Sequence, residues 1–299
     1  MLGATRAQLY RLFHGRLFWV FLAVLMIPIL LSAVLLAVVT GNDALAALFG
    51  TSGDALASAT APGVSAGVST SSDFARLLGA VSDESAPFAL YGSSFVNGSF
   101  IGMLAAAFTG LFAAQDLSGD KRRGFAKNLL QARGGRFAYA ASHLVAAAVA
   151  GALLVLAGAA CTMLFYGGMG FAVLPASAAE FALWTVQVWL GIFAYQLLTL
   201  LAVFVTRSEA AGVLVGLFLG GFAVEKGLML AVGAAAAAAG SAGPLAEAAD
   251  LLENASPMAL MSTLGHGAMG DPAAVAAAGL VCAVAAALGL AVMRRRSMG

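Results

Sequence analysis

Charged residues are scarce in this sequence. Only 10% of its 299 residues are Asp, Glu, Lys or Arg, whereas 62% are apolar. A soluble surface needs roughly a quarter of its residues charged, so the composition excludes an ordinary soluble globular protein. It predicts an all-α membrane protein, because apolar helices satisfy their own backbone hydrogen bonds inside a bilayer.

Recognisable catalytic and metal-binding motifs are also missing. The chain contains no GxxxxGK[ST] loop and no HExxH motif, and its three histidines lie in three separate regions. Its two cysteines, Cys161 and Cys282, both fall inside apolar runs without ligand-like spacing. These absences argue against a disulfide framework and a metal site. We therefore expect no enzymatic activity and no cofactor held by this chain itself.

The polar segment 115–136 stands between two long apolar runs and carries six of the fifteen Lys and Arg residues. A basic segment flanked by spans belongs on the cytoplasmic face. Within it, residues 124–130 form a predicted short amphipathic helix, with Phe125, Leu129 and Leu130 on one face. Such a helix is suited to docking on a partner protein.

The hydropathy pattern divides the chain into a single transmembrane domain, residues 1–299, with six membrane spans. The predicted spans are residues 17–39, 93–114, 137–166, 179–205, 210–226 and 272–293. This layout places thirteen of the fifteen basic residues on the cytoplasmic side together with both termini. We expect a multi-pass protein of the bacterial inner membrane.

Residues 1–16 carry apolar side chains at helical spacing, with Arg11 on the opposite side, and predict a helix in the inner membrane interface. A cleaved signal peptide is the competing interpretation. It is disfavoured because the following apolar run is about twice as long as a usual signal-peptide core. Trp184 and Trp189, toward the outer end of span four, match the aromatic residues expected at a membrane interface.

Two outer segments connect the spans. Residues 40–92 are rich in Ser, Thr, Gly and Ala and contain one basic residue, Arg76, against several acids. Residues 227–264 predict an outer hairpin of short re-entrant helices between spans five and six. In it Ser256 is the expected N-cap of a helix that begins at Pro257.

Small residues at four-residue spacing predict close helix packing in two spans. Gly98 and Gly102 share one face of span two, and Gly212, Gly216 and Gly220 share one face of span five. A face of this kind lets two backbones approach closely inside a membrane. We expect Gly216→Leu to impair assembly or transport through packing.

Glu225 and Lys226 form a candidate charge pair that interrupts the apolar run after span five. In a continuous helix the pair lies near the outer leaflet, where intramembrane charges mark functional sites. Alternatively, span five ends at the pair, which then lies at the water-accessible interface. The second interpretation predicts that Glu225→Gln is mild, since an exposed ion pair contributes only about 0–1 kcal/mol.

The arrangement around the basic segment resembles the ABC-2 type permease subunits of bacterial ABC exporters. The resemblance rests on Gln115-Asp116 at the end of span two, the GFAKNLL segment at 124–130, and GRFAY at 135–139 before span three. Within that family the chain resembles the permeases that stand beside bacitracin and lantibiotic resistance ATPases. In that family this loop is the main coupling helix onto the ATPase. The coupling residues that the resemblance implies here are Asp116, Lys121, Arg122, Arg123, Gly124, Phe125, Lys127, Asn128, Leu129 and Leu130.

The resemblance implies a half-transporter that pairs with a second permease, the same chain or a paralogue, and with cytosolic ABC ATPase subunits. The ATPase binds ATP and Mg, and the permease moves an amphipathic substrate, such as a peptide antibiotic or drug, by alternating access. The residues do not indicate where the substrate binds, and nothing indicates a nucleic-acid partner. Two other classes stay open: an ion-coupled secondary carrier that uses Glu225 and Lys226, and a membrane scaffold or sensor without transport.

Overall fold

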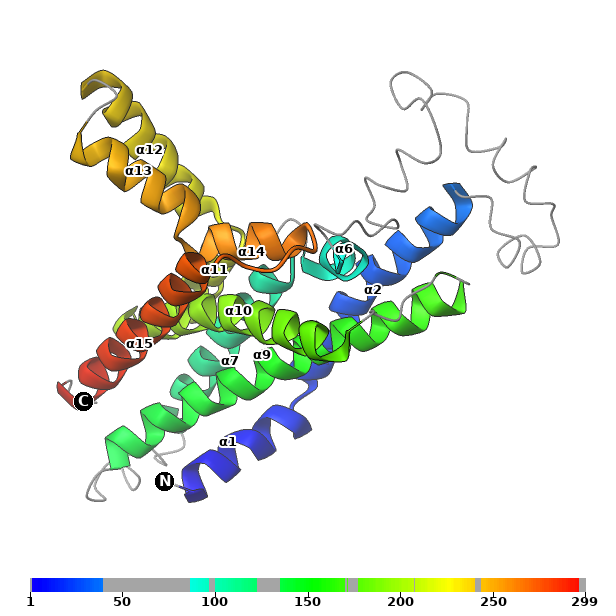
Figure 1. The fold of residues 1–299 in the computed structure, drawn as a ribbon. Helices are drawn as coiled ribbons and strands as arrows, with labels where there is room; N and C mark the ends of the chain where they lie inside the picture. Colours follow the sequence, from blue (N-terminus) through cyan, green and yellow to red (C-terminus); the bar gives the residue numbers. More distant parts are fainter. Residues whose placement is uncertain are drawn as a thin grey trace.

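The computed structural model describes residues 2–39, 87–96, 100–122, 135–169, 171, 177–206, 208–239 and 243–295. These ranges consist of helices joined by short turns and contain no β-strand (Figure 1). The prediction of an all-α protein is therefore confirmed for the described part of the chain.

The described helices follow one another in chain order. They are α1 (Leu2–His14), α2 (Arg16–Val39), α6 (Ala89–Tyr91), the π-helical turn η1 (Gly92–Val96), α7 (Phe100–Arg122), α9 (Gly135–Gly168), α10 (Ala178–Thr206), α11 (Glu209–Gly220), α12 (Ala223–Ala239), α13 (Pro244–Asn254), α14 (Pro257–Gly265) and α15 (Pro272–Arg295).

Among the described residues, five helices are long and apolar enough to cross a membrane. They are α2, α7, α9, α10 and α15. A sixth span is counted if α11 and α12, which are bent by 58° at the break between them, are taken together. The protein is thus a multi-pass membrane protein with five or six candidate spans.

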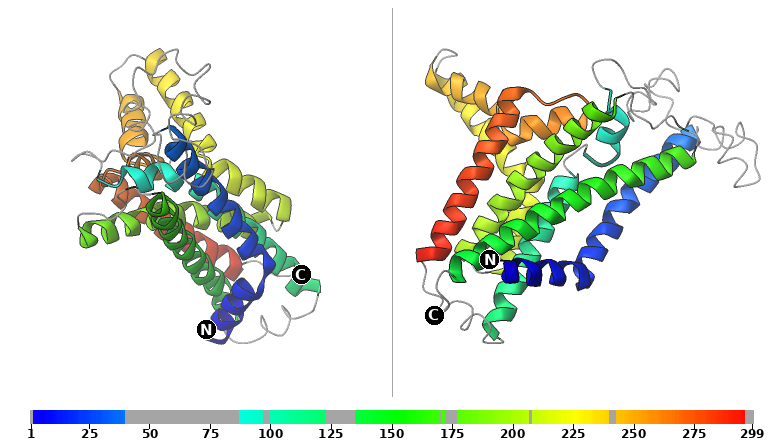
Figure 2. Two further views of the ribbon diagram at one scale, coloured as in Figure 1. Left: turned by 90° about the vertical axis from the view of Figure 1, so that its right-hand side faces the viewer. Right: turned by 60° about the horizontal axis from the view of Figure 1, so that its bottom comes forward.

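Helix α10 lies at the centre of the bundle and contacts α7, α9, α11, α14 and α15. Helices α1 and α2 pack against the other side of α9. Both marked ends of the chain lie at one end of the bundle, which we call the terminal end, while the α12–α13 hairpin projects from the opposite end (Figure 1, Figure 2).

An aromatic cluster closes the bundle near α6 and η1. Phe88, Tyr91 and Phe95 meet Phe181 and Trp184 of α10 with ring centroids 4.7–6.3 Å apart. The side chain of Trp184 is completely buried. The neighbouring aromatic rings cover it, and its expected position near the membrane interface stays a prediction.

The second and fifth spans differ most from their predicted bounds. Helix α7 begins at Phe100, seven positions after the predicted start at 93, and continues to Arg122, so residues 115–122 of the predicted loop are helical. Helix α11 ends at Gly220 rather than at 226. Two glycines in succession, 220 and 221, weaken the helix there, and Phe222 has a left-handed backbone with a φ of 61°.

The short helices after α12 begin where the sequence signals indicate. The hydroxyl of Ser256 accepts a hydrogen bond from the backbone N–H of Ala259 at 3.1 Å, and α14 begins at Pro257. Asp271 likewise accepts from the N–H of Ala273 at the start of α15. The predicted N-cap at Ser256 is confirmed.

Candidate functional site

Helices α7 and α11 meet along a line of small residues, which we call the glycine seam. It consists of Gly102, Ala106 and Gly110 on α7 and Gly212, Gly216 and Gly220 on α11. A Cβ atom placed on Gly216 meets the carbonyl carbon and oxygen of Ala106 at 2.8 Å, and one placed on Gly220 meets the carbonyl oxygen of Gly102 at 2.6 Å. A Cβ on Gly110 collides with the carbonyl of Gly212.

These contacts are between backbones, so no side chain can rotate away to make room. The seam therefore needs glycine at Gly216, Gly220 and Gly110. Gly102 differs from them, because a Cβ there lies 3.4 Å from the nearest atom, the carbonyl oxygen of Gly220. Four of the five glycines singled out in the sequence thus lie in one helix contact, and Gly98 falls outside the described residues.

A buried polar contact joins α10 to α7 beside the seam. The side-chain amide of Gln196 donates a hydrogen bond to the hydroxyl of Thr109 at 3.0 Å, and both residues are almost completely buried. The Thr109 hydroxyl donates in turn to the carbonyl of Ala105 at 2.8 Å. Because an apolar environment offers these groups no water, the contact fixes α10 against α7 at one position.

Glu225 lies in the first turn of α12, directly after the break in the helix. Its carboxylate accepts a hydrogen bond of 2.5 Å from the hydroxyl of Tyr195, whose side chain is fully buried in α10. The ring of Tyr195 also contacts that of Phe222, the residue with a positive φ at the helix break, at 5.4 Å between centroids. Lys226 is exposed on another side of α12.

The structure therefore separates the two members of the candidate charge pair. Glu225 faces the bundle, and Lys226 faces away from it. The helix breaks just before the pair, so the interpretation of one continuous helix through residue 226 does not describe this chain. The alternative, a pair at the water-accessible interface, describes the exposed Lys226 better than Glu225, which is half-buried against a buried tyrosine.

An ion pair connects α1 to α7 at the terminal end, and a histidine of α9 lies beside it. The guanidinium of Arg11 in α1 lies 2.7 Å from the carboxylate of Asp116 in α7. The other carboxylate oxygen of Asp116 lies 3.9 Å from Nε2 of His143 in α9, whose side chain is almost completely buried. The ring of His143 packs edge-on against Tyr139 and Phe204. The carboxylate thus holds the N-terminal helix at the base of the segment between α7 and α9.

Most of the predicted coupling residues lie in the part of the chain that the structure does not describe. Asp116 lies within α7, and Lys121 and Arg122 are its last two residues. The others, Arg123, Gly124, Phe125, Lys127, Asn128, Leu129 and Leu130, fall in the undescribed range 123–134. The predicted docking helix at 124–130 therefore stays a prediction.

Sequence reasoning missed the partners of both carboxylates. Arg11 is 105 positions from Asp116, and Tyr195 is 30 positions from Glu225. His143 and Gln196 are single polar residues within long apolar runs, and that isolation was the signal that could have identified them as buried contacts.

The described residues contain no group of three or more His, Cys, Asp or Glu side chains arranged to hold a metal ion. No protein-family model matches the chain, and no curated protein matches it significantly. The class that the fold itself defines is a multi-pass α-helical membrane protein.

Proposed function

We propose that this chain is the membrane permease subunit of an ATP-driven ABC-2 type exporter, which moves an amphipathic substrate by alternating access. In this proposal a separate cytosolic ATPase binds ATP and Mg, and a second permease completes the pathway. In this proposal the terminal end of the bundle faces the cytoplasm of a bacterial cell. This orientation agrees with the predicted cytoplasmic position of both termini and of thirteen of the fifteen basic residues.

The contact between Arg11, Asp116 and His143 carries the proposal. The three residues come from α1, α7 and α9, and Asp116 and His143 lie about two helical turns from the end of α7 and the start of α9. A partner that pushes on the segment between α7 and α9 therefore acts on three packed helices at once. Rigid helices linked by such contacts transmit a movement further than a free loop does.

The number of membrane spans and the positions of the short helices are part of the same proposal. Six spans result when the bent pair α11 and α12 forms one broken span. Helix α1 then lies in the inner interface, and the outer hairpin consists of the part of α12 beyond Lys226 together with α13 and α14. The glycine seam supports this reading, because close backbone contact between spans two and five is a means of packing helices in lipid.

Co-purification with an ATPase tests the proposal. The full-length chain is isolated from its native membranes, and proteins bearing a nucleotide-binding loop are identified by mass spectrometry. We expect such an ATPase with the wild type and its loss from the double variant Lys127→Glu with Leu130→Asp, because that variant reverses a charge and removes an apolar contact on the predicted docking helix. ATPase recovery equal to wild type in the variant contradicts the coupling role.

The control variant makes the same two chemical changes at the opposite end of the molecule. Lys226 and Leu251 are both exposed on the α12–α13 hairpin. Lys226→Glu with Leu251→Asp therefore alters charge and hydropathy equally without touching the terminal end. The ATPase is expected to remain bound to this control.

A second candidate is an ion-coupled secondary carrier, and the hydrogen bond between Tyr195 and Glu225 favours it. A carboxylate beside a break in an apolar helix is a plausible place for a coupling ion. This candidate predicts substrate movement that depends on an ion gradient and continues without ATP. Transport by the purified chain in ATP-free vesicles distinguishes it from the exporter.

A further inference from the structure

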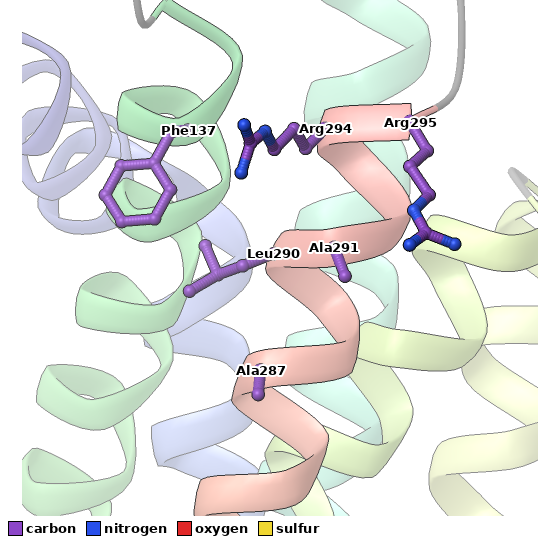
Figure 3. A pocket seen from close by; sticks show the side chains of 6 residues that line it. All are labelled: Phe137, Ala287, Leu290, Ala291, Arg294 and Arg295. Atoms are coloured by element: carbon purple, nitrogen blue, oxygen red, sulfur yellow. The ribbon is translucent and has the colours of Figure 1, made fainter.

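A cavity of about 610 Å³ opens between the start of α9 and the end of α15, at the terminal end of the bundle. Four of the described residues that line it are apolar: Phe137, Ala287, Leu290 and Ala291. The other two are Arg294 and Arg295. Arg294 extends from α15 toward Phe137, Leu290 points into the same space, and Arg295 projects from the other side of α15 (Figure 3).

The charge of this cavity has one sign. Its described lining contains two guanidinium groups and no carboxylate. Both arginines are exposed, and the structure records no ion pair that neutralises either of them among the described residues. Guanidinium groups form paired hydrogen bonds to phosphate oxygens, so the cavity is complementary to a phosphate group.

An apolar track leads from the cavity along α15. Leu280, Val284, Ala287, Ala291 and Arg294 are separated by four, three, four and three positions, so they share one face of the helix. All five are exposed on this chain, and Leu280 is 66% exposed. The face is thus apolar over about three turns, from Leu280 to Ala291, and becomes basic where the helix ends.

We propose that the cavity between α9 and α15 binds a phospholipid with an anionic headgroup. Arg294 holds the phosphate, with Arg295 at the rim, while Phe137 and Leu290 enclose the glycerol region. The acyl chains lie along the apolar track on α15. Basic pockets between spans are known to accept anionic headgroups. The inference requires only insertion of the chain into a membrane, so it stands whether or not an ATPase couples to this protein.

A phospholipid matches both features of the site, whereas a free anion matches one. Inorganic phosphate or glycerol phosphate contacts the arginines and leaves the apolar track uncovered. The cavity volume is within the range of small-molecule sites, about 300–1,000 Å³, which suits a headgroup with the first part of its chains. The track then accommodates the rest of the lipid on the surface of the helix.

Titration of the full-length protein in neutral detergent, followed by native mass spectrometry, measures lipid binding directly. The probes are phosphatidylglycerol, phosphatidylcholine and water-soluble glycerol 1-phosphate. We expect phosphatidylglycerol to bind several-fold more tightly than phosphatidylcholine. Arg294→Gln is expected to weaken phosphatidylglycerol about fivefold, because one arginine near an anionic headgroup contributes on that order.

Matched control variants distinguish binding in this cavity from the effects of overall charge and of a bulky substitution. Arg6→Gln removes the same charge from an exposed position on α1 and is expected to leave lipid affinity unchanged. Ala287→Trp fills the cavity while keeping both arginines, and it is expected to displace the lipid. Its control is Ala160→Trp, at an exposed position on α9 away from the cavity lining and from the apolar track on α15.

Three results overturn the proposal. If Arg294→Gln and Arg6→Gln weaken phosphatidylglycerol binding equally, the lipid preference depends on the overall charge of the protein and not on this cavity. Full competition by glycerol 1-phosphate identifies an anion site without a lipid. Unchanged phosphatidylglycerol binding in Ala287→Trp, accompanied by loss of self-association, assigns this face to a second copy of the chain.

Discussion

Replacement of Gly216 by alanine tests the packing of the glycine seam most directly. The added Cβ atom lies 2.8 Å from three backbone atoms of α7, in Ala106 and Ala107. Since carbon atoms pack at about 3.5–4.0 Å, the two helices must separate locally by up to about 1 Å. Separation at this position also opens the adjacent contacts of Gly212 and Gly220.

The expected cost follows from two opposing effects. Overpacking of a tight contact destabilises by about 1–3 kcal/mol, and the better helix propensity of alanine returns up to about 1 kcal/mol. The net loss of about 1–2 kcal/mol lowers the melting temperature by roughly 2–8 °C for a protein of this size class. Gly216→Leu, with a larger side chain, is expected to lower it further.

Thermal unfolding of the detergent-solubilised protein, followed by size-exclusion chromatography, provides the measurement. Gly102→Ala is the control within the seam, because its Cβ meets no atom closer than 3.4 Å. Gly279→Ala is the control outside it, because a Cβ there meets nothing within 4 Å. We expect both to be close to wild type. If Gly216→Ala is as stable as Gly279→Ala, or if Gly102→Ala destabilises equally, the seam does not determine the packing.

Two further predictions concern charge and topology. Glu225→Gln is expected to change the unfolding free energy little, since the amide oxygen still accepts a hydrogen bond from the Tyr195 hydroxyl. Glu225→Ala leaves that buried hydroxyl without an acceptor, so we expect it to lower the unfolding free energy by about 1–3 kcal/mol. Lys226→Ala is the exposed control, and equal stability of the two Glu225 variants contradicts the importance of the hydrogen bond. Single cysteines at Ser69 and Ser118 are expected to react with membrane-impermeant reagents from opposite sides of the membrane, and labelling of both from one side excludes the six-span layout.

The sequence alone determined the fold class and the approximate position of each apolar helix. Long apolar runs must form helices in a bilayer, because no other backbone partners are present there. The predicted start of a short helix was equally reliable, because the interactions that begin a helix involve residues close together in the sequence. Ser256 with Pro257 begins α14 because a capping hydroxyl and a proline at the first helical position act within one turn.

Only the tertiary structure decided which residues meet. The spacing of Gly212, Gly216 and Gly220 predicted a packing face, but the choice of α7 as its partner depends on how every other helix packs. Likewise, nothing in the local sequence relates Arg11 to Asp116 or Tyr195 to Glu225, because those pairs form between helices distant along the chain. Glu225 and Lys226 point to different sides because successive residues of α12 are about 100° apart around the helix axis. The tertiary structure decided which of them meets Tyr195, because the break at Phe222 sets the direction in which α12 leaves α11.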